Sequence, residues 1–224
     1  MPLLVNDTYT QNLEPMSEET VALLMSHCSK RKLPRKGIVF RAGDPADTLY
    51  YIVSGSVSVT AVDEDGSEII LAYLNEGEFI GEMGLFITDI ARNALVRARS
   101  ETELAEISYT KLNHLLKTEL SEHHAIILRT ISFQLAQRLL KTSKRISLLT
   151  STDVSGRISR ILLDMCYEPE AMSHPEGTQI HISRQEIGRI INCSRETVGR
   201  VLKKMADEGM IEVQGMNIVV YHSR

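Results

Sequence analysis

Apolar and polar residues alternate in short runs along much of the first half of the chain, from about Arg31 to Ser108. Two of these runs, Leu49–Val53 and Val57–Val62, are rich in β-branched and aromatic residues. Turn residues separate the runs, and Asp65-Gly66 has the form of a hairpin turn. Several short strands at regular intervals predict a small barrel or sandwich.

Helical patterns border this strand-rich stretch on both sides. Residues 1–16 are polar and predict a loose tail, and Ser17 with its two following glutamates predicts a helix start. Tyr109–Lys117 predicts a short helix after the strands.

A long helix is predicted from about Glu122 to about Thr150, because no Gly or Pro interrupts this stretch. Apolar residues recur with the three-four spacing of a coiled-coil seam at Leu128, Ile131, Leu135 and Leu149. Polar residues stand at later seam positions, namely Arg138, Thr142 and Arg145. We expect this helix to pair with its copy in a second chain and its polar part to face a ligand.

Helical spacing resumes after Asp153, and a loop is predicted across Glu168–Gly177. A strand at Thr178–Ile182, two helices and a terminal hairpin around Gly215 complete the expected order of elements.

Residues 183–204 have the pattern of a helix-turn-helix. Ser183 and Glu186 form a capping box, Ser194 starts a second helix, and Asn192 between them tolerates positive φ. Gly188 suits a close approach of the two helices. The apolar residues fall where the helices would meet, at Ile187, Ile191, Cys193, Val198 and Val201. An ordinary helical hairpin is the alternative.

The second helix of this unit exposes side chains suited to the major groove of DNA. Arg195 and Arg200 could bind guanine, and Glu196 could accept from cytosine. Hydroxyl and basic side chains nearby suit phosphates. The candidate DNA-binding residues are Ser183, Arg184, Gln185, Ser194, Arg195, Glu196, Thr197, Arg200 and Lys203.

Charge agrees with this assignment. Residues 141–204 hold 11 Lys and Arg against 7 Asp and Glu, whereas the rest of the chain holds 14 against 22. A basic stretch beside an acidic body favours nucleic acid at the C-terminal end, although two differently solvated surfaces would give the same asymmetry.

The 224 residues suit one large or two small domains, and 43% hydrophobic residues suffice for a normal core. No apolar run reaches the roughly 18 residues of a membrane helix, and no signal pattern opens the chain. Three scattered cysteines predict free thiols in a reducing cytoplasm. We therefore expect a cytoplasmic protein with no membrane partner.

The second candidate site lies around Gly81-Glu82, where a strand ends and a short helix begins. Glycine lets backbone N–H groups approach an anion, and Arg92 could neutralise a phosphate. Glu82 could accept a sugar hydroxyl. Phosphate and sugar together indicate a nucleotide, with a plain turn as the alternative.

The chain resembles the cyclic-AMP receptor proteins of the Crp/Fnr family of bacterial transcription regulators over nearly all of residues 20–224. The matching blocks are residues 48–53, 81–86, 105–109, 173–177, 184–188 and 193–200.

The resemblance implies that the ligand is cyclic AMP. Its implied contacts are Gly81, Glu82, Met83, Arg92, Asn93, Arg138, Thr142 and Ser143, the last from the partner chain. Asn93 replaces a small hydroxyl residue of the family. The Lys117–His124 segment is about five residues longer than the family usually shows.

The implied fold is α+β, with a β-roll (jelly-roll-like) cyclic-nucleotide-binding domain in residues 1–121. A dimerisation helix and hinge would follow in 122–152, and a winged helix-turn-helix in 153–224. The implied partners are a palindromic double-stranded DNA site and RNA polymerase. The polymerase would touch the Ser173–Gly177 loop and a patch with Arg31 and Lys111, where Ser29 replaces a basic residue.

Three other functions stay open. The same fold could respond to cyclic-di-GMP or act without ligand. An enzyme or its cyclic-nucleotide-binding regulatory subunit is a second alternative, although no catalytic constellation or metal spacing supports an enzyme. A redox or haem sensor is the third, but only Cys28 lies near the N-terminus.

Overall fold

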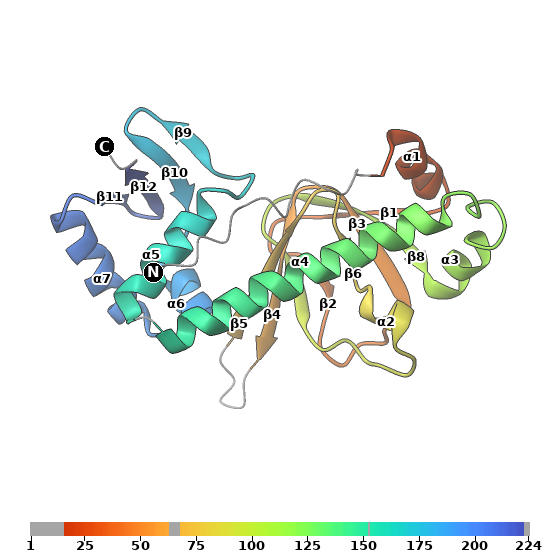
Figure 1. The fold of residues 1–224 in the computed structure, drawn as a ribbon, viewed down its shortest axis with the longest axis horizontal. Coiled ribbons are helices and arrows are strands. Elements are labelled where there is room, and N and C mark those ends of the chain that lie inside the picture. The colour runs from red at the N-terminus through yellow and green to blue at the C-terminus, as the bar shows by residue number, and fades with distance from the viewer. Residues whose placement is uncertain (1–15, 63–67, 152, 222–224) are drawn as a thin grey trace. The chain divides into compact units, whose positions relative to one another are not determined.

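The computed structural model describes residues 16–62, 68–151 and 153–221, and for residues 144–151 only the course of the backbone (Figure 1). The chain divides into two compact units. The first contains the residues up to Val57 together with Leu74–Leu140. The second contains Ser58–Tyr73, which we call the β-arm, and the chain from Lys141 onward.

Short antiparallel strands build a β-sandwich, as the alternating pattern predicts. One sheet has the order β1-β8-β3-β6 and the other the order β2-β7-β4-β5. The predicted Asp65-Gly66 turn lies outside the described residues. The strands are β1 (Ser29–Leu33), β2 (Ile38–Phe40), β3 (Thr48–Ser54), β4 (Ser56–Val62), β5 (Glu68–Asn75), β6 (Phe79–Ile80), β7 (Leu95–Ala98) and β8 (Thr102–Ser108).

Helices pack beside this sandwich, and local capping explains where two of them start. The Ser17 hydroxyl accepts from the Thr20 amide at 3.2 Å, and the Ser108 hydroxyl accepts from the Lys111 amide at 3.3 Å. Each cap satisfies an amide that has no partner within the helix. The helices of this part are α1 (Glu18–Ser26), α2 (Met83–Phe86), α3 (Tyr109–Leu115) and α4 (His124–Ser151).

The first half of the long helix α4 belongs to the core of the first unit. Ile127 and Ile131 are 0% and 1% exposed, and Leu128 and Leu135 pack partly buried against the same cluster. The prediction that Ile131 forms part of a seam between chains is therefore wrong, because this side chain is enclosed by its own domain. Leu139 and Leu140, one turn further along, are 68% and 55% exposed.

The segment between α3 and α4, noted above for its length, also contributes to this core. Leu120 is 0% exposed, and its amide donates to the Leu115 carbonyl at 2.8 Å. The extra residues therefore form turns anchored by an apolar side chain.

The second unit has a helical core and a small sheet with the order β11-β12-β10-β9. Asp153 caps its first helix by accepting from the Gly156 amide at 2.8 Å. The predicted loop across Glu168–Gly177 instead contains β9, which pairs with β10. The elements are α5 (Val154–Met165), β9 (Met172–His174), β10 (Gly177–His181), α6 (Arg184–Ile191), α7 (Arg195–Asp207), β11 (Ile211–Gln214) and β12 (Asn217–Tyr221).

The β-arm packs within this second unit. Ile70 and Tyr73 belong to the same buried cluster as the apolar faces of α5, α6 and α7. The Tyr73 hydroxyl donates to Glu186 Oε1 at 2.6 Å, and Glu68 Oε2 lies 3.0 Å from Arg189 Nη1. Apolar contact, a hydrogen bond and an ion pair thus hold the arm against α6.

The turn between α6 and α7 has the geometry that the sequence predicts. Asn192 is left-handed, with φ 52° and ψ 60°, and the Cys193 amide donates to the Gly188 carbonyl at 3.0 Å. A Cβ atom on Gly188 would lie 2.5 Å from the Cys193 carbonyl oxygen. Only glycine therefore permits this approach of the two helices without a backbone shift.

Gly188→Ala is accordingly expected to destabilise the second unit by about 1–3 kcal/mol, because the added methyl group collides with backbone. Urea denaturation of the full chain, followed by circular dichroism, measures the change. Gly199→Ala is the matched control, since its Cβ would meet nothing closer than Arg184 Cδ at 3.6 Å. The control should be neutral or stabilising by about 0.5–1 kcal/mol, and equal effects of the two variants would contradict the steric argument.

Candidate functional site

The helix-turn-helix presents a polar face on α7 and at the start of α6. Ser194 caps α7 by accepting from the Thr197 amide at 3.2 Å, and Ser183 caps α6 by accepting from the Glu186 amide at 3.1 Å. The capping box is only half formed, because the Glu186 side chain bonds Tyr73. The exposed residues of the predicted set are Arg184, Gln185, Ser194, Arg195, Glu196, Arg200 and Lys203, while Ser183 and Thr197 are half-buried.

A hollow of about 580 Å³ lies on this face. Its lining includes Arg184 from α6 and Arg195, Glu196 and Lys203 from α7. Four of the predicted contact residues of the two helices therefore converge on one surface, and three of these four are basic. Such a surface is suited to a polyanion.

Glu196 is a lone carboxylate among these bases. Its own backbone amide and then the Ser194 hydroxyl donate to it, and with Arg195 and Arg200 they hold its pKa below the usual range. The side chain is therefore ionised at neutral pH and accepts hydrogen bonds only. Arg200 Nη2 lies 3.3 Å from the Thr197 hydroxyl, which orients the guanidinium along the same helix.

The second site, which we call the cradle, consists of Gly81, α2 and the Arg92-Asn93 segment. Gly81 has φ 81°, a conformation that favours glycine. Glu82 is 7% exposed, and Arg138 of α4 donates to its Oε1 at 2.9 Å. Arg138 also donates to the Phe79 carbonyl at 2.6 Å, so the helix and the cradle are joined by charge and by backbone.

Arg92 is turned into the protein. Its side chain is 6% exposed, and its guanidinium carbon lies 4.4 Å from the centre of the Phe40 ring. Nη1 donates to the Gly81 carbonyl at 3.1 Å and to the Tyr109 hydroxyl at 3.0 Å, and Nη2 donates to the Thr48 carbonyl. These acceptors, rather than solvent, surround the group predicted to bind a phosphate.

The donor set nevertheless fits an anionic ligand. Among the described residues, Nε of Arg92 and Nε of Arg138 are buried and have no hydrogen-bond acceptor. A buried N–H without an acceptor is costly, and an incoming phosphate or hydroxyl oxygen would satisfy it.

The other predicted ligand residues are solvent-facing. Asn93 is exposed and its amide nitrogen lies 3.8 Å from the Met83 sulfur, while Met83 is 39% exposed. Thr142 and Ser143 are exposed on α4, and their predicted contacts with a base stay predictions. The side chain of Arg145 lies outside the described residues.

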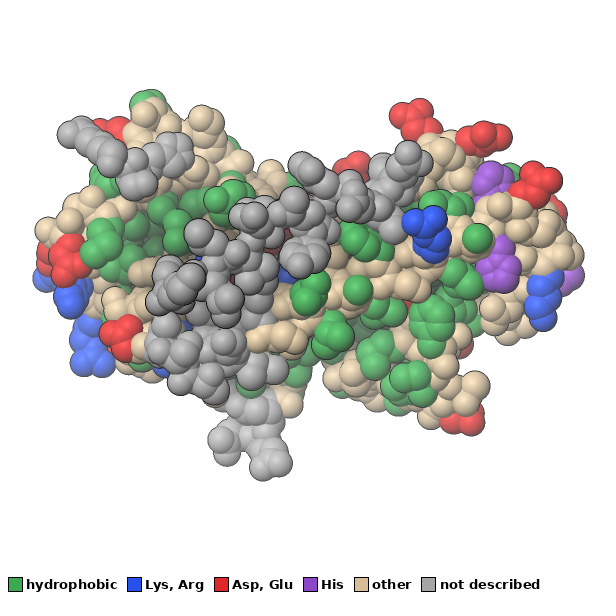
Figure 2. All heavy atoms as spheres, in the orientation of Figure 1, with side chains coloured by type: hydrophobic (Ala, Val, Ile, Leu, Met, Phe, Trp, Pro, Cys, Tyr) green, Lys and Arg blue, Asp and Glu red, His purple; other side chains and the backbone are tan. Residues whose placement is uncertain are grey.

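Hydrophobic side chains gather along α4 and over α2 on the face shown in Figure 2. Exposed apolar side chains near the cradle are Met83, Phe86 and Ile87, and those on α4 are Leu139 and Leu140.

Two further residues shape the cradle, and no role was predicted for either from the sequence. Gln134 accepts from the Phe79 amide and donates to the Gly77 carbonyl, both at 2.9 Å. Tyr109 bonds both Arg92 and the Gly81 carbonyl. Burial raises the pKa of Tyr109 above its usual value, so the hydroxyl is protonated and donates to that carbonyl. Gln134 stands one helical turn before Arg138, and this spacing was its only signal.

Of the residues predicted to meet RNA polymerase, two make polar contacts within their own domain and three others are exposed to solvent. Arg31 pairs with Glu106 at 3.2 Å, and the Lys111 ammonium donates to the His27 carbonyl at 2.6 Å. Ser173, Pro175 and Glu176 are exposed.

The cysteines have little reactive character. Burial raises the pKa of the Cys28 thiol to about 11 and moves those of Cys166 and Cys193 in the same direction. A protonated thiol is a poor nucleophile and metal ligand. Among the described residues, no group of His, Cys, Asp or Glu could hold a metal ion. No described helix combines the length and the apolar character needed to span a bilayer.

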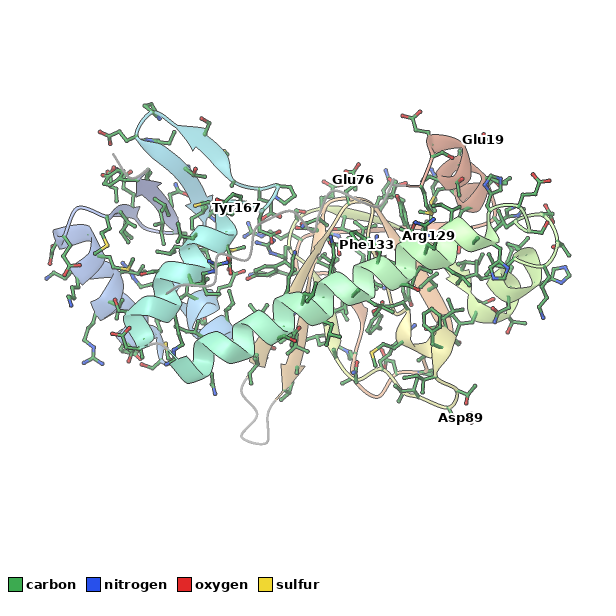
Figure 3. All side chains as sticks on the ribbon, viewed as in Figure 1. Glu19, Glu76, Asp89, Arg129, Phe133 and Tyr167 are labelled. Carbon is green, nitrogen blue, oxygen red and sulfur yellow. The ribbon has the colours of Figure 1, made fainter. Side chains whose placement is uncertain are left out.

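α4 carries both cradle contacts and solvent-facing groups. Figure 3 shows Arg129 and Phe133 along this helix; Arg129 is exposed and Phe133 is half-buried.

Comparison with known proteins identifies the domain that holds each candidate site. Residues 30–119 match the model of the cyclic nucleotide-binding domain, and residues 156–222 match the Crp-like helix-turn-helix domain. The CRP-like protein Clp of Xanthomonas campestris pv. campestris (strain 8004) is 48% identical over 205 residues, which are 92% of this chain and 89% of that relative.

Solved structures of related regulators have the same fold. The structure of the c-di-GMP responsive global regulator CLP of Xanthomonas campestris is 47% identical, with a TM-score of 0.87, and the match covers 92% of this chain and 100% of that one. A CRP/FNR-family transcriptional regulator from Thermus thermophilus is 22% identical with a TM-score of 0.72, over 87% of this chain and 94% of that one, which shows the shared fold.

These findings confirm the predicted α+β fold, but the relatives at 47% and 48% identity are CRP-like Clp proteins rather than cyclic-AMP receptor proteins specifically. The chain belongs to the Crp/Fnr family of DNA-binding transcription regulators, and it is not an enzyme.

Proposed function

We propose that this regulator binds DNA as a homodimer under the control of cyclic-di-GMP. The observation that carries the ligand assignment is the 47% identity, over 92% of the chain, to a regulator described as c-di-GMP responsive. The sequence resemblance to cyclic-AMP receptor proteins is the weaker guide, because it rests on short blocks, three of which lie outside the nucleotide-binding domain.

The cradle supplies a physical argument in the same direction. Asn93 takes the place of a small hydroxyl residue, and Arg92 is enclosed by its own domain at 6% exposure. A small mononucleotide would depend on both. A ligand with two phosphates would depend less on these two residues, because its second phosphate need not reach the enclosed arginine.

Cyclic AMP is the competing ligand, and one feature favours it. Glu82, Arg92 and Arg138 combine an acceptor for ribose with donors for phosphate in one place. When either nucleotide binds, it supplies the phosphate and sugar oxygens that these groups would hold.

The remaining assignments follow from surface chemistry. The exposed Leu139 and Leu140 give α4 an apolar surface that a second copy would cover. A dimer would place two copies of α7 about 34 Å apart, on a palindromic site. We assign the sensor to residues 1–121, the dimerisation helix and hinge to 122–152 and the DNA-binding domain to 153–224. The 173–177 segment, which has exposed residues, and the patch with Arg31 and Lys111 would contact RNA polymerase in the cytoplasm.

Cyclic-di-GMP should change the affinity of the purified protein for DNA by about tenfold, since a ligand with different affinity for two states shifts their populations. Fluorescence anisotropy on a palindromic duplex, selected from random sequence by the protein itself, measures this. Cyclic AMP at the same saturation should change the affinity less than about twofold. A response to cyclic AMP alone would restore the competing ligand, and no response to either would overturn ligand control.

Arg200→Ala should weaken binding to the same duplex by about 1–3 kcal/mol, or roughly 5- to 150-fold, because a base contact is lost. Lys204→Ala is the matched control, as it removes the same charge from the same helix. The Lys204 ammonium lies 3.8 Å from Glu208 in the last turn of α7, and it should matter little. Equal losses would mean that α7 supplies only general electrostatic attraction.

A further inference from the structure

Tyr109 contacts the arginine of the cradle, Arg92. Three described acceptors hold the Arg92 guanidinium, namely the carbonyls of Gly81 and Thr48 and the Tyr109 hydroxyl. The Phe40 ring lies against its face at 4.4 Å. The side chain is 6% exposed, and even its unsatisfied Nε is shielded from solvent. A phosphate arriving from solvent therefore cannot reach Arg92 until some of these contacts break.

Tyr109 is the one side-chain acceptor in this set, and it is itself fixed on three sides. Its hydroxyl accepts from Arg92 and donates to the Gly81 carbonyl. Its ring lies against Gly84 in α2, where a Cβ atom would come within 2.7 Å of it. Its amide donates to the Asp47 carbonyl at 2.9 Å. Tyr109 is the first residue of α3, and its side chain therefore connects this helix to Arg92, to Gly81 and to α2.

This arrangement has a consequence for affinity. If only a fraction of the protein is in the binding-competent state, the apparent dissociation constant equals the intrinsic one divided by that fraction, so the ligand binds more weakly. Each hydrogen bond made only in the enclosed state lowers the population in which Arg92 is available. One such bond shifts an equilibrium by about 3- to 10-fold.

We propose that Tyr109 is a positioning residue that holds Arg92 in the enclosed state and thereby lowers the affinity of the cradle for the phosphate of a cyclic nucleotide. The proposal rests on the proposed function in one respect, namely that a cyclic nucleotide binds at the cradle. The phenol acts on the ligand only through Arg92 and the Gly81 carbonyl.

Tyr109→Phe removes the hydroxyl and keeps the ring that packs on Gly84. Isothermal titration calorimetry of the full-length protein with cyclic-di-GMP and with cyclic AMP should show a gain in affinity of about 3- to 10-fold for the nucleotide that uses the cradle. Tyr51→Phe is the matched control. Tyr51 is also a half-buried tyrosine, its ring packs edge-on against Phe79 at 5.0 Å, and among the described residues it makes no hydrogen bond or ring contact with Arg92.

A second measurement separates positioning from a general loosening of the fold. Exchange of the Arg92 Nε–H with water, followed by nitrogen-15 NMR, should become faster in Tyr109→Phe while the melting temperature and the Tyr51→Phe protein stay close to wild type. Unchanged affinity or unchanged exchange would overturn the proposal. Reduced affinity would also overturn it, because the hydroxyl would then support the ligand-bound state instead.

The outcomes also distinguish this inference from the proposed function. If cyclic-di-GMP alters DNA binding but Tyr109→Phe binds it as wild type does, the role of Tyr109 fails and the function stands. If neither nucleotide alters DNA binding but Tyr109→Phe still binds one more tightly, the function fails and the role of Tyr109 stands. If neither protein binds either nucleotide, both fail.

Discussion

The ion pair between Arg138 and Glu82 is the interaction on which the sensor depends most. The side chains of Glu82 and Arg138 are 9% and 19% exposed, and charges removed from water to this degree are costly unless they are paired. Removing one partner of such a pair costs about 3–5 kcal/mol, because the other charge is left uncompensated. The pair also fixes geometry, since Arg138 belongs to α4 and Glu82 immediately precedes α2. Together with Gln134 and the buried Ile131, it makes the first half of α4 a part of the sensor.

Local chemistry made much of the fold predictable. Ser17, Ser183 and Ser194 cap helices because a hydroxyl can satisfy a free amide from that position alone. Asn192 and Gly188 were recognisable because a tight turn between two helices demands a residue that tolerates positive φ and a residue without a Cβ. In each case the rule involves only a few neighbouring residues, so the sequence carries it in full. The polar face of α7 was also predictable, because the apolar residues of this helix recur with helical spacing and leave its polar residues on the other side.

Tertiary contacts were less predictable, for physical reasons. A helix that packs into its own domain and one that packs on a second chain need the same apolar spacing, so Ile131 could not be assigned to either from sequence. β9 was missed because three residues with exposed or half-buried side chains become a strand only by pairing with β10. Arg92 lies beside Gly81, and its role as a phosphate ligand stays a prediction. Its inward orientation depends on Thr48, Gly81 and Tyr109, which lie far from it along the chain.

That orientation bears on how the cradle could discriminate between ligands. Arg92 already donates hydrogen bonds to neutral acceptors. A ligand therefore gains only the difference in energy between hydrogen bonds to its phosphate oxygen and hydrogen bonds to those acceptors. The hydrogen bonds to these neutral acceptors already have a charged donor, but a phosphate adds the Coulomb attraction between two opposite charges, which leaves a phosphate the advantage. A ligand without a charged oxygen would have no such advantage and would leave Arg92 enclosed. Selection for phosphate thus follows from the energy of the enclosed state, even before any contact with the base is considered.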